Sequence, residues 1–370
     1  MKVVVTGSRG FIGKNLCIFL REEHHEVLEI HRETLQHDML SYLQQADFVF
    51  HLAGVNRPLD INEFQSGNVD LTQFIVKSLS DSNKSVPLVL TSSTQVENDN
   101  EYGASKLAAE SLVQSYAASS GAAYYIYRLP NVFGKWCKPN YNSFVATFCN
   151  NVMKGIDITV HEPNSPVKLV YIDDVCSSFL KLLDVETASG FHKVPIEFST
   201  TVGEVANIIL SFKSNRTSLV TERVGSELTR ALYSTYLSYT SPNNFNYSIP
   251  SYEDERGIFC EMLKTKDSGQ FSFFTAHPGI TRGGHYHHTK NEKFLVIKGE
   301  AVFKFENIAS GQRYKLTVNG SKPEIVETVP GWTHDITNSG DEELIVMLWA
   351  NEVFDPEKPD TISRELFKEE

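Results

Sequence analysis

Residues 1–13 read MKVVVTGSRGFIG, and this stretch decides the fold of the first half of the chain. A β-branched apolar run comes first, glycines spaced G-x-x-G-x-x-G follow it, and a helix-like pattern begins among them. Glycines at a strand-to-helix turn let the backbone approach a pyrophosphate, whose charge the free N–H groups at the helix start can bind. An ordinary strand-to-helix turn is the alternative. The residues expected to line a dinucleotide here are Gly7, Arg9, Gly10, Phe11, Ile12 and Gly13.

Strand-like and helix-like segments alternate from this turn as far as Leu129. Helices are expected over residues 12–22 and 105–118, between short β-rich apolar runs. Strands that alternate with helices form a parallel sheet through right-handed crossovers. We therefore expect an α/β domain with a Rossmann-type parallel sheet. Its strands are predicted at residues 2–6, 26–30, 47–52, 86–92 and 123–129.

The second expected strand ends in EIHR, without the acidic residue that would bond the ribose hydroxyls of NAD. Arg32 and Arg9 suit a 2′-phosphate instead, because guanidinium groups match phosphate oxygens. The sequence therefore favours NADPH over NADH, with His31 and Arg32 beside the cofactor. A solvated surface charge is the alternative for Arg32.

Tyr102 and Lys106, in the segment YGASK, lie one helical turn apart and share a helix face. The segment follows TSS, residues 91–93, at the end of the fourth expected strand. A lysine ammonium beside the phenol is expected to lower its pKa, and a hydroxyl can bond the substrate oxygen. These groups suit carbonyl reduction, in which the oxygen takes a proton while hydride reaches the carbon. The expected catalytic residues are Ser93, Tyr102 and Lys106, with Ser92 as the alternative hydroxyl.

Residues 1–245 resemble an extended short-chain dehydrogenase/reductase, whose catalytic Tyr and Lys match Tyr102 and Lys106. HLAG (51–54), Asn68, RLPNVFG (128–134) and YIDDV (171–175) also fit the family's pattern. Related sugar-nucleotide dehydratases carry Asp-Glu after the catalytic hydroxyl, where this chain has Thr-Gln, which favours a simple reductase. The resemblance implies further cofactor contacts at Leu52, Ala53, Gly54, Tyr102, Lys106 and Asn131.

The pattern loosens over residues 139–245, which are expected to form a small substrate lobe with helices at 142–154 and 174–183. In many members of this family such a lobe holds the diphosphate of a nucleotide sugar, and Lys168 and Arg216 are the candidate cations. The polar, turn-rich stretch at 240–250 marks the expected boundary. The predicted domains are residues 1–245 and residues 246–370.

Beyond this boundary strand-like runs recur with little helix, which predicts an all-β sandwich or barrel. His285 and His287 alternate along a strand and so point to one face. With Glu292 and His334 they make a set of three imidazoles and one carboxylate, which suits zinc, nickel, iron or manganese and not calcium. The strands are predicted at residues 259–265, 270–277, 293–297, 301–307, 313–318, 324–329 and 343–350.

Residues 255–370 resemble a cupin, a jelly-roll barrel, through the segment 279–299 and, more loosely, through PGWTHDITN at 330–338. The resemblance implies a divalent metal, with zinc the first choice, bound by His285, His287, Glu292 and His334. A barrel that has lost its metal is the alternative. His288 alternates with His287 and is expected to face outward. The candidate acids and bases near the metal are Tyr286, Lys298, Lys304 and Asp335.

Over its full length the chain resembles the CapF-type bifunctional enzymes of capsule and O-antigen synthesis. The resemblance implies that the cupin epimerises carbon 3 of a UDP-2-acetamido-2,6-dideoxy-4-keto-hexose. The reductase part would then reduce the 4-keto group with NADPH to UDP-2-acetamido-2,6-dideoxy-L-talose, on the path to UDP-N-acetyl-L-fucosamine. The alternatives are a single-activity reductase whose cupin only binds or dimerises, and a nonenzymatic NADPH sensor. Both parent families commonly associate, so a homodimer is expected.

Composition excludes some other classes of protein. The net charge of -12 argues against a global basic surface for nucleic acid, although a local cluster can still bind an anion. The five cysteines are widely spaced without a C-x-x-C pair, which predicts reduced thiols. No apolar run reaches membrane-spanning length, and the first residues are strand-like and unlike a signal peptide. We therefore expect a cytoplasmic protein.

Overall fold

Two compact units make up the chain in the computed structural model. The first contains Met1–Phe133, Tyr141–Ser143 and Val167–Ser199, and the second contains Gly134–Asn140, Phe144–Pro166 and Thr200–Glu370. The segment 200–245 thus belongs to the same compact unit as the barrel, whereas the sequence placed it in the first domain. The division at residue 245 stays a prediction. The structure describes residues 1–82, 84–185, 187–225, 227–249, 252–254, 257–259, 263–265, 269–352 and 357–367.

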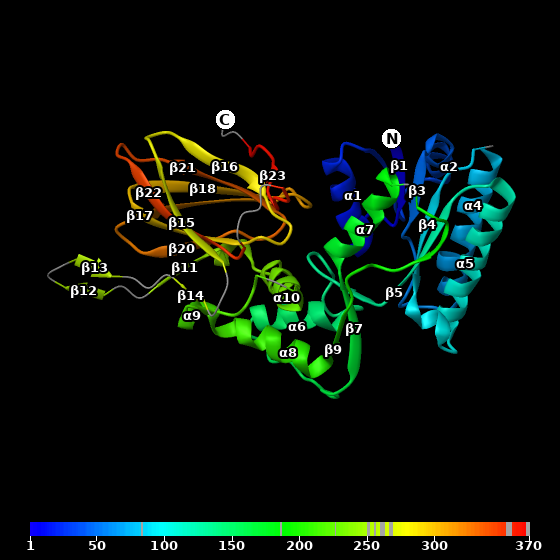
Figure 1. The fold of residues 1–370 in the computed structure, drawn as a ribbon, viewed down its shortest axis with the longest axis horizontal. Coiled ribbons are helices and arrows are strands. Elements are labelled where there is room, and N and C mark those ends of the chain that lie inside the picture. Colours follow the sequence, from blue (N-terminus) through cyan, green and yellow to red (C-terminus); the bar gives the residue numbers. More distant parts are fainter. Residues whose placement is uncertain are drawn as a thin grey trace. The chain divides into compact units, whose positions relative to one another are not determined.

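The first unit is built on a six-stranded sheet in the order β2-β1-β3-β4-β5-β8 (Figure 1). Its neighbouring strands run parallel, which confirms the predicted Rossmann-type sheet. The strand order reverses between β1 and β3, and parallel sheets bind ligands at the carboxyl ends of such a switch point. The strands are β1 (Lys2–Thr6), β2 (Glu26–Ile30), β3 (Phe48–His51), β4 (Leu88–Ser93), β5 (Tyr124–Leu129) and β8 (Gly190–His192).

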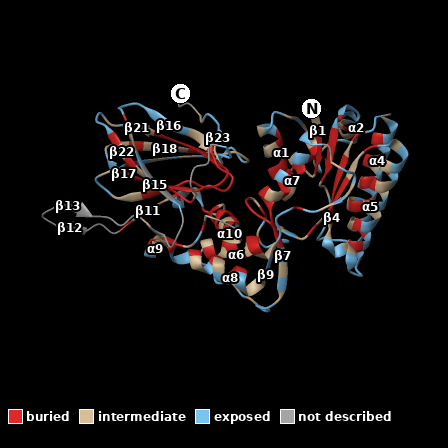
Figure 2. Ribbon diagram, viewed as in Figure 1, coloured by how far each residue is buried: buried red, intermediate tan, exposed pale blue. Residues whose placement is uncertain are grey.

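Helices cover both faces of this sheet, so its central strands are buried on both sides (Figure 2). Val3, Val4 and Val5 are consecutive and fully buried, the continuous apolar pattern that parallel strands require. One face carries α1 (Phe11–Glu22) and α7 (Ile172–Asp184), which pack against each other. The other carries α2 (Gln36–Gln45), α4 (Leu71–Asp81) and α5 (Glu101–Ser120). Short helical turns precede α4 at α3 (Asn62–Phe64) and η1 (Gln65–Asp70), and η2 (Thr94–Glu97) precedes α5.

Residues 131–244 contribute a cluster of helices and a small three-stranded sheet. Helices α6, α8 and α10 pack together in the second unit. A side-chain and backbone capping box between Thr201 and Glu204 starts α8. The elements are β6 (Asn131–Phe133), α6 (Phe144–Met153), β7 (Pro166–Tyr171), β9 (Phe198–Thr201), α8 (Val202–Ser211), η3 (Phe212–Ser214), α9 (Asn215–Ser218), β10 (Val220–Thr221), α10 (Glu227–Leu237) and η4 (Pro242–Asn244); β6, β7 and β9 form one sheet.

The rest of the second unit contains two five-stranded antiparallel sheets, β11-β20-β17-β22-β15 and β19-β18-β21-β16-β23. Buried side chains of both sheets, such as Phe294 and Phe303, form one apolar core. This confirms the all-β prediction and is consistent with a cupin jelly roll. The strands are β11 (Asn246–Ser248), β12 (Tyr252–Asp254), β13 (Gly257–Phe259), β14 (Lys264–Thr265), β15 (Gln270–Ala276), β16 (Thr281–Tyr286), β17 (Glu292–Lys298), β18 (Glu300–Asn307), β19 (Arg313–Asn319), β20 (Glu324–Glu327), β21 (Trp332–Asn338), β22 (Leu344–Ala350) and β23 (Ile362–Ser363).

Two further expectations concern membranes and thiols. Among the described helices, none combines the length and the apolar character needed to cross a bilayer. The described cysteines, Cys17, Cys137, Cys149 and Cys176, are free thiols and buried. Cys260 lies outside the described residues.

Candidate functional site

The glycine turn after β1 has the geometry of an anion-binding loop. Gly7 has φ +68°, and a Cβ there would lie 2.8 Å from the backbone of Ala53. The Gly10 N–H donates to the Gly7 carbonyl over 2.8 Å, and a Cβ at Gly13 would lie 2.2 Å from that oxygen. Helix α1 then starts at Phe11 without a side-chain cap, which leaves its first N–H groups available to a ligand. The turn can therefore take a phosphate group in close contact with the backbone.

The HLAG segment after β3 is held next to this turn. The N–H groups of Leu52 and Ala53 each donate to the Thr6 hydroxyl over 3.2 Å. Asn68 is buried, and its side chain accepts from the Val55 N–H over 2.7 Å and donates to the Val55 carbonyl over 3.0 Å. The predicted cofactor residues of the two loops are thereby brought together at the switch point of the sheet.

Tyr102 and Lys106 lie in the first turns of α5, which starts where the Asn100 side chain accepts from the Gly103 N–H. Lys106 Nζ donates to the Thr91 carbonyl over 3.0 Å. A Cβ at Gly54 would lie 2.9 Å from the same Nζ, so the ammonium lies against the backbone of Gly54. These contacts put the predicted catalytic pair next to the HLAG segment.

The two candidate hydroxyls, those of Ser93 and Ser92, have different partners in the structure. The Ser93 hydroxyl accepts from the Gln95 N–H over 3.1 Å and lies close enough to the phenol of Tyr102 to lower its pKa. The Ser92 hydroxyl instead donates to Glu110 Oε1 over 2.5 Å and is buried. Ser93 is therefore the serine that can share a substrate oxygen with Tyr102.

The predicted lowering of the Tyr102 pKa is wrong for this structure. Burial raises the pKa of the phenol, and the neighbouring Ser93 hydroxyl opposes that rise only in part. The Lys106 ammonium donates to the Thr91 carbonyl and not to the phenol. Burial also lowers the pKa of Lys106 to about 8, against the opposing charge of Glu110. His51, buried between the hydroxyls of Thr6 and Thr72, has its pKa lowered to about 3 by burial and by Lys106, so its ring is neutral.

The residues predicted to select the cofactor lie at the end of β2. Arg9 and Arg32 are exposed, and the Arg9 guanidinium pairs with the Glu33 carboxylate. The His31 Nδ1 accepts from the Glu33 N–H over 3.3 Å. Sequence reasoning missed Glu33, an acidic group two residues beyond the position where an NAD site would carry one. The two arginines are thus available to a phosphate only if Arg9 leaves its partner.

Three other predicted contact residues have partners within the protein. Asn131 is exposed at the start of β6, where its side-chain amide donates to the Lys168 carbonyl over 3.4 Å. Lys168 pairs with Glu197 over 3.0 Å, and Arg216 pairs with the buried Glu327 over 2.5 Å. The two candidate diphosphate cations therefore already have carboxylate partners.

The four predicted metal ligands converge in the barrel. Their ligand atoms all lie within 4.8 Å of one another. His287 Nε2 lies 3.1 Å and His334 Nε2 3.4 Å from Glu292 Oε2. His285 completes the cluster, with its ring centroid 4.8 Å from that of His334. A register shift after Gly283, which has φ +100°, precedes His285 in β16.

The charges of this cluster suit a divalent cation. Burial, and then the charges of His334 and His287, lowers the pKa of His285 to about 4, so its imidazole is neutral. Burial alone would raise the pKa of Glu292, yet the neighbouring His287 and His334 hold it well below its usual range. Neutral imidazoles and an ionised carboxylate are the states that bind metal. The residues present therefore fit zinc or a similar transition metal.

Two residues that sequence reasoning missed support this cluster. The Asp360 carbonyl accepts the Nδ1 proton of His287, which leaves Nε2 for a metal. The Asp360 carboxylate also accepts the backbone N–H groups of residues 288–290, at 2.6 to 2.8 Å. Lys290 Nζ lies 3.0 Å from Glu292 Oε1. No local pattern could reveal Asp360, because it lies 73 residues from His287.

Lys304 and Asp335, two of the predicted acids and bases, are not among the metal ligands. The prediction that His288 faces outward was wrong. His288 is buried, 7% exposed, and packs edge-on against the ring of Tyr286. Lys304 and Asp335 are register partners that alternate with the inward-facing Phe305 and His334, so they lie on the opposite face of their sheet.

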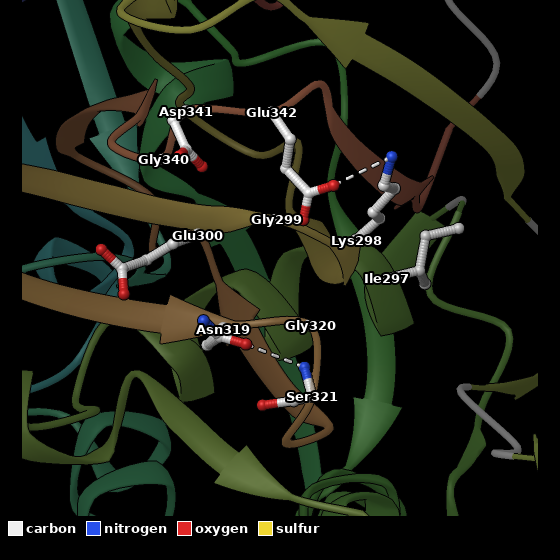
Figure 3. A pocket seen from close by; sticks show the side chains of 10 residues that line it. All are labelled: Ile297, Lys298, Gly299, Glu300, Asn319, Gly320, Ser321, Gly340, Asp341 and Glu342. Carbon is white, nitrogen blue, oxygen red and sulfur yellow. Dashed lines mark hydrogen bonds and ion pairs between the residues drawn. The ribbon is translucent and has the colours of Figure 1, made fainter.

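Lys298 is also far from the metal ligands. It ends β17, whose first residue is Glu292, and this separates the two by roughly 20 Å at 3.3 Å per residue. There it lines a pocket of loop residues, where it pairs with Glu342 over 3.1 Å (Figure 3). Lys298 therefore has no role in proton transfer at the metal cluster.

Two family models match the chain, one described as the NAD dependent epimerase/dehydratase family, over residues 3–192. The chain belongs to the NAD-dependent epimerase/dehydratase family. The second, the polysaccharide biosynthesis C-terminal domain, matches residues 252–362.

Full-length relatives share both parts. The UDP-2-acetamido-2,6-beta-L-arabino-hexul-4-ose reductase of Pseudomonas aeruginosa is 54% identical over 363 residues, which cover 98% of each chain. The capsular polysaccharide assembling protein CapF from Staphylococcus aureus is 40% identical, with a TM-score of 0.68 over 99% of this chain and 100% of that one. The predicted resemblance to CapF-type proteins is confirmed. A UDP-N-acetylglucosamine 4-epimerase from Bacillus cereus, 24% identical with a TM-score of 0.52, covers 59% of this chain and 83% of its own and shares the fold.

Proposed function

We propose that this family member is a bifunctional sugar-nucleotide enzyme. Its first site reduces the 4-keto group of a UDP-2-acetamido-2,6-dideoxy-4-keto-hexose with NADPH, and its metal cluster first epimerises carbon 3 of that sugar. The product is UDP-2-acetamido-2,6-dideoxy-L-talose, on the path to UDP-N-acetyl-L-fucosamine for capsule or O-antigen. The observation that carries the proposal is Ser93, Tyr102 and Lys106 beside a glycine turn, in a chain 54% identical to a reductase named for such a sugar.

The residues of the first site have complementary tasks in a reduction. NADPH, when bound, supplies the hydride. The glycine turn and the start of α1 hold the pyrophosphate. The Tyr102 phenol donates a proton to the ketone oxygen while the Ser93 hydroxyl hydrogen-bonds that oxygen. The Lys106 ammonium places positive charge beside the site, which favours the anionic form of Tyr102 once the proton has left.

The barrel suits the chemistry of epimerisation next to a ketone. A divalent metal held by His285, His287, Glu292 and His334 would supply a Lewis acid for the ketone oxygen. The same ketone that accepts hydride also acidifies carbon 3, so both activities act on one substrate. The Asp360 carbonyl fixes the orientation of His287 and thereby the ligand set.

Incubation of the 4-keto UDP-sugar in deuterated water, with and without NADPH, tests both halves by NMR. Deuterium at carbon 3 without NADPH is expected from the epimerase, and reduction at carbon 4 appears only with NADPH. His287→Ala should lose the exchange and oxidise NADPH only when it is given the already epimerised 4-keto sugar. Tyr102→Phe should keep the exchange and lose roughly 100-fold or more in the rate of reduction. A wild type that oxidises NADPH without any exchange has a passive barrel and only the reductase activity. If Tyr102→Phe kept full turnover, the reductase assignment would be wrong.

The assembly is proposed to be a homodimer, as the sequence resemblance suggests. Light scattering of the purified protein measures this directly. A monomeric mass at micromolar concentration would contradict it.

A further inference from the structure

Glu110 lies on the same face of α5 as the catalytic pair. Tyr102, Lys106 and Glu110 are spaced four residues apart, so successive helical turns present them to β4. Glu110 is 1% exposed, although a carboxylate is rarely buried without partners. The reduction itself assigns no task to this residue.

The buried carboxylate is fully engaged. Arg128 of β5 binds it with two hydrogen bonds, from Nε to Oε1 over 3.0 Å and from Nη2 to Oε2 over 2.7 Å. The Ser92 hydroxyl donates to Oε1 over 2.5 Å. Such a two-pronged arginine pair is geometrically specific. Glu110 is therefore fixed between β4, β5 and α5.

Three consecutive residues of β4 face this helix. The Thr91 carbonyl accepts from Lys106, the Ser92 hydroxyl donates to Glu110, and the Ser93 hydroxyl lies close to the Tyr102 phenol and lowers its pKa. Because Ser92 lies between the other two, a shift of Ser92 would move both. The bond to Glu110 thus sets the register of the strand end against the catalytic helix.

We propose that Glu110 is a positioning residue of the reductase site, which holds Ser93 at Tyr102 through Ser92 and supplies the negative charge that acts on the Lys106 ammonium. The proposal rests on the proposed reductase function. The chemical role of the carboxylate is electrostatic and geometric, and no bond to it forms or breaks.

The charged groups around Lys106 support the electrostatic role of Glu110. Burial lowers the pKa of Lys106 to about 8, and Glu110 is the group that raises it. His51, on β3, adds no charge because its pKa is lowered to about 3. Tyr102, on the same helix, is neutral because burial raises its pKa. Arg128, on β5, offsets part of the Glu110 charge, and the exposed Glu97 acts on Arg128.

A titration of Lys106 tests the charge without substrate or cofactor. In protein labelled with ¹³C at lysine Cε, the Lys106 resonance is identified by its loss in Lys106→Met. Glu110→Gln keeps an acceptor for Ser92 and removes the charge, so the Lys106 midpoint should fall by about one pH unit or more. Arg128→Met should raise it, and Ser92→Ala, which keeps the carboxylate, should leave it in place. An unchanged midpoint in Glu110→Gln would overturn the electrostatic role, and if that variant does not fold, an unchanged midpoint in Arg128→Met would do so.

Measurements of turnover distinguish the positioning role of Glu110 from its electrostatic role. Ser92→Ala should lower kcat for NADPH-dependent reduction of the 4-keto UDP-sugar about tenfold at every pH, since it loosens Ser93 without changing charge. Glu110→Gln should lose more activity as pH rises, because its Lys106 gives up its proton earlier. Full activity in Ser92→Ala would overturn the positioning role. A wild type without reduction would refute the proposed function, while the Lys106 titration would still decide the role of Glu110.

Discussion

Nε2 of His287, just after β16, lies 3.1 Å from Oε2 of Glu292, the first residue of β17, and His334 of β21 approaches the same oxygen. Their distances and charges predict a transition metal bound at about one ion per chain. Elemental analysis of wild type should find it, and His287→Ala should remove it. The exposed His277, replaced by Ala, is the matched control and should keep it. Metal-free wild-type protein with full epimerase activity would contradict the assignment.

The neutral, buried His51 predicts acid sensitivity of the first unit. Its folded pKa is about 3 and the unfolded value is about 6.5, so between these pH values only the unfolded chain binds the proton. Stability is therefore complete above pH 6.5 and falls as pH drops towards 3. At pH 5 the loss from this residue is about 2 kcal/mol, or 1.36 kcal/mol times the 1.5 units from the unfolded pKa.

Hydrogen exchange of β1 and β3 peptides, corrected for intrinsic rates, measures this loss in the first unit. Between pH 7 and pH 5, His51→Gln should lose less protection than wild type, because glutamine does not titrate. An equal loss in both proteins would show that His51 does not cause the acid sensitivity.

The Rossmann-type sheet could be predicted closely, because buried parallel strands appear as short apolar runs. β1 matches its predicted range, and β4 and β5 differ from theirs by one or two residues. Helix α5 starts four residues earlier than predicted, where the Asn100 side chain caps it ahead of the apolar pattern. A strand was expected at His285 and His287, but the range of β16 was not predicted, because Gly283 and Gly284 interrupt the β-branched pattern.

In the candidate sites, too, residues with a regular local spacing could be predicted, whereas contacts between distant parts of the sequence could not. The metal ligands and the Tyr-Lys pair could be predicted because their spacing within strands and helices sets the face on which they lie. Lys298 was a poor candidate because only the position of its strand end shows its distance from Glu292. The contacts of Asp360 with His287, and of Glu110 with Arg128, depend on tertiary pairing that no short pattern carries.

We expect cofactor preference to depend on the Arg9–Glu33 pair at the end of β2. Arg32→Ala should raise KM for NADPH more than KM for NADH, because a guanidinium is lost from the 2′-phosphate. Glu33→Gln frees Arg9 from its partner and should lower KM for NADPH. Steady-state kinetics with both cofactors measures these changes. Equal changes in the two KM values for Arg32→Ala would undo the predicted preference for NADPH.

Glu327 is 2% exposed and neutralises two cations in the second unit, Lys293 of β17 and Arg216 of α9. Burial alone would raise its pKa, yet Arg216 and Lys293 hold the carboxyl below its usual range, so it is ionised. Glu327→Gln would leave Lys293, 1% exposed, without its counter-charge. We expect a loss of about 3 to 5 kcal/mol in the unfolding free energy of this unit.

Urea unfolding followed by tryptophan fluorescence reports this unit, because Trp136, Trp332 and Trp349 all belong to it. Glu342→Gln, which breaks the exposed pair with Lys298, is the control and should change stability by about 0.5 kcal/mol or less. The double variant Lys293→Met with Glu327→Gln removes a charge of each sign and should recover part of the loss. If the double variant were less stable than Glu327→Gln alone, charge imbalance would not be the cause, and the contacts of Lys293 with Tyr247 would have to account for the stability.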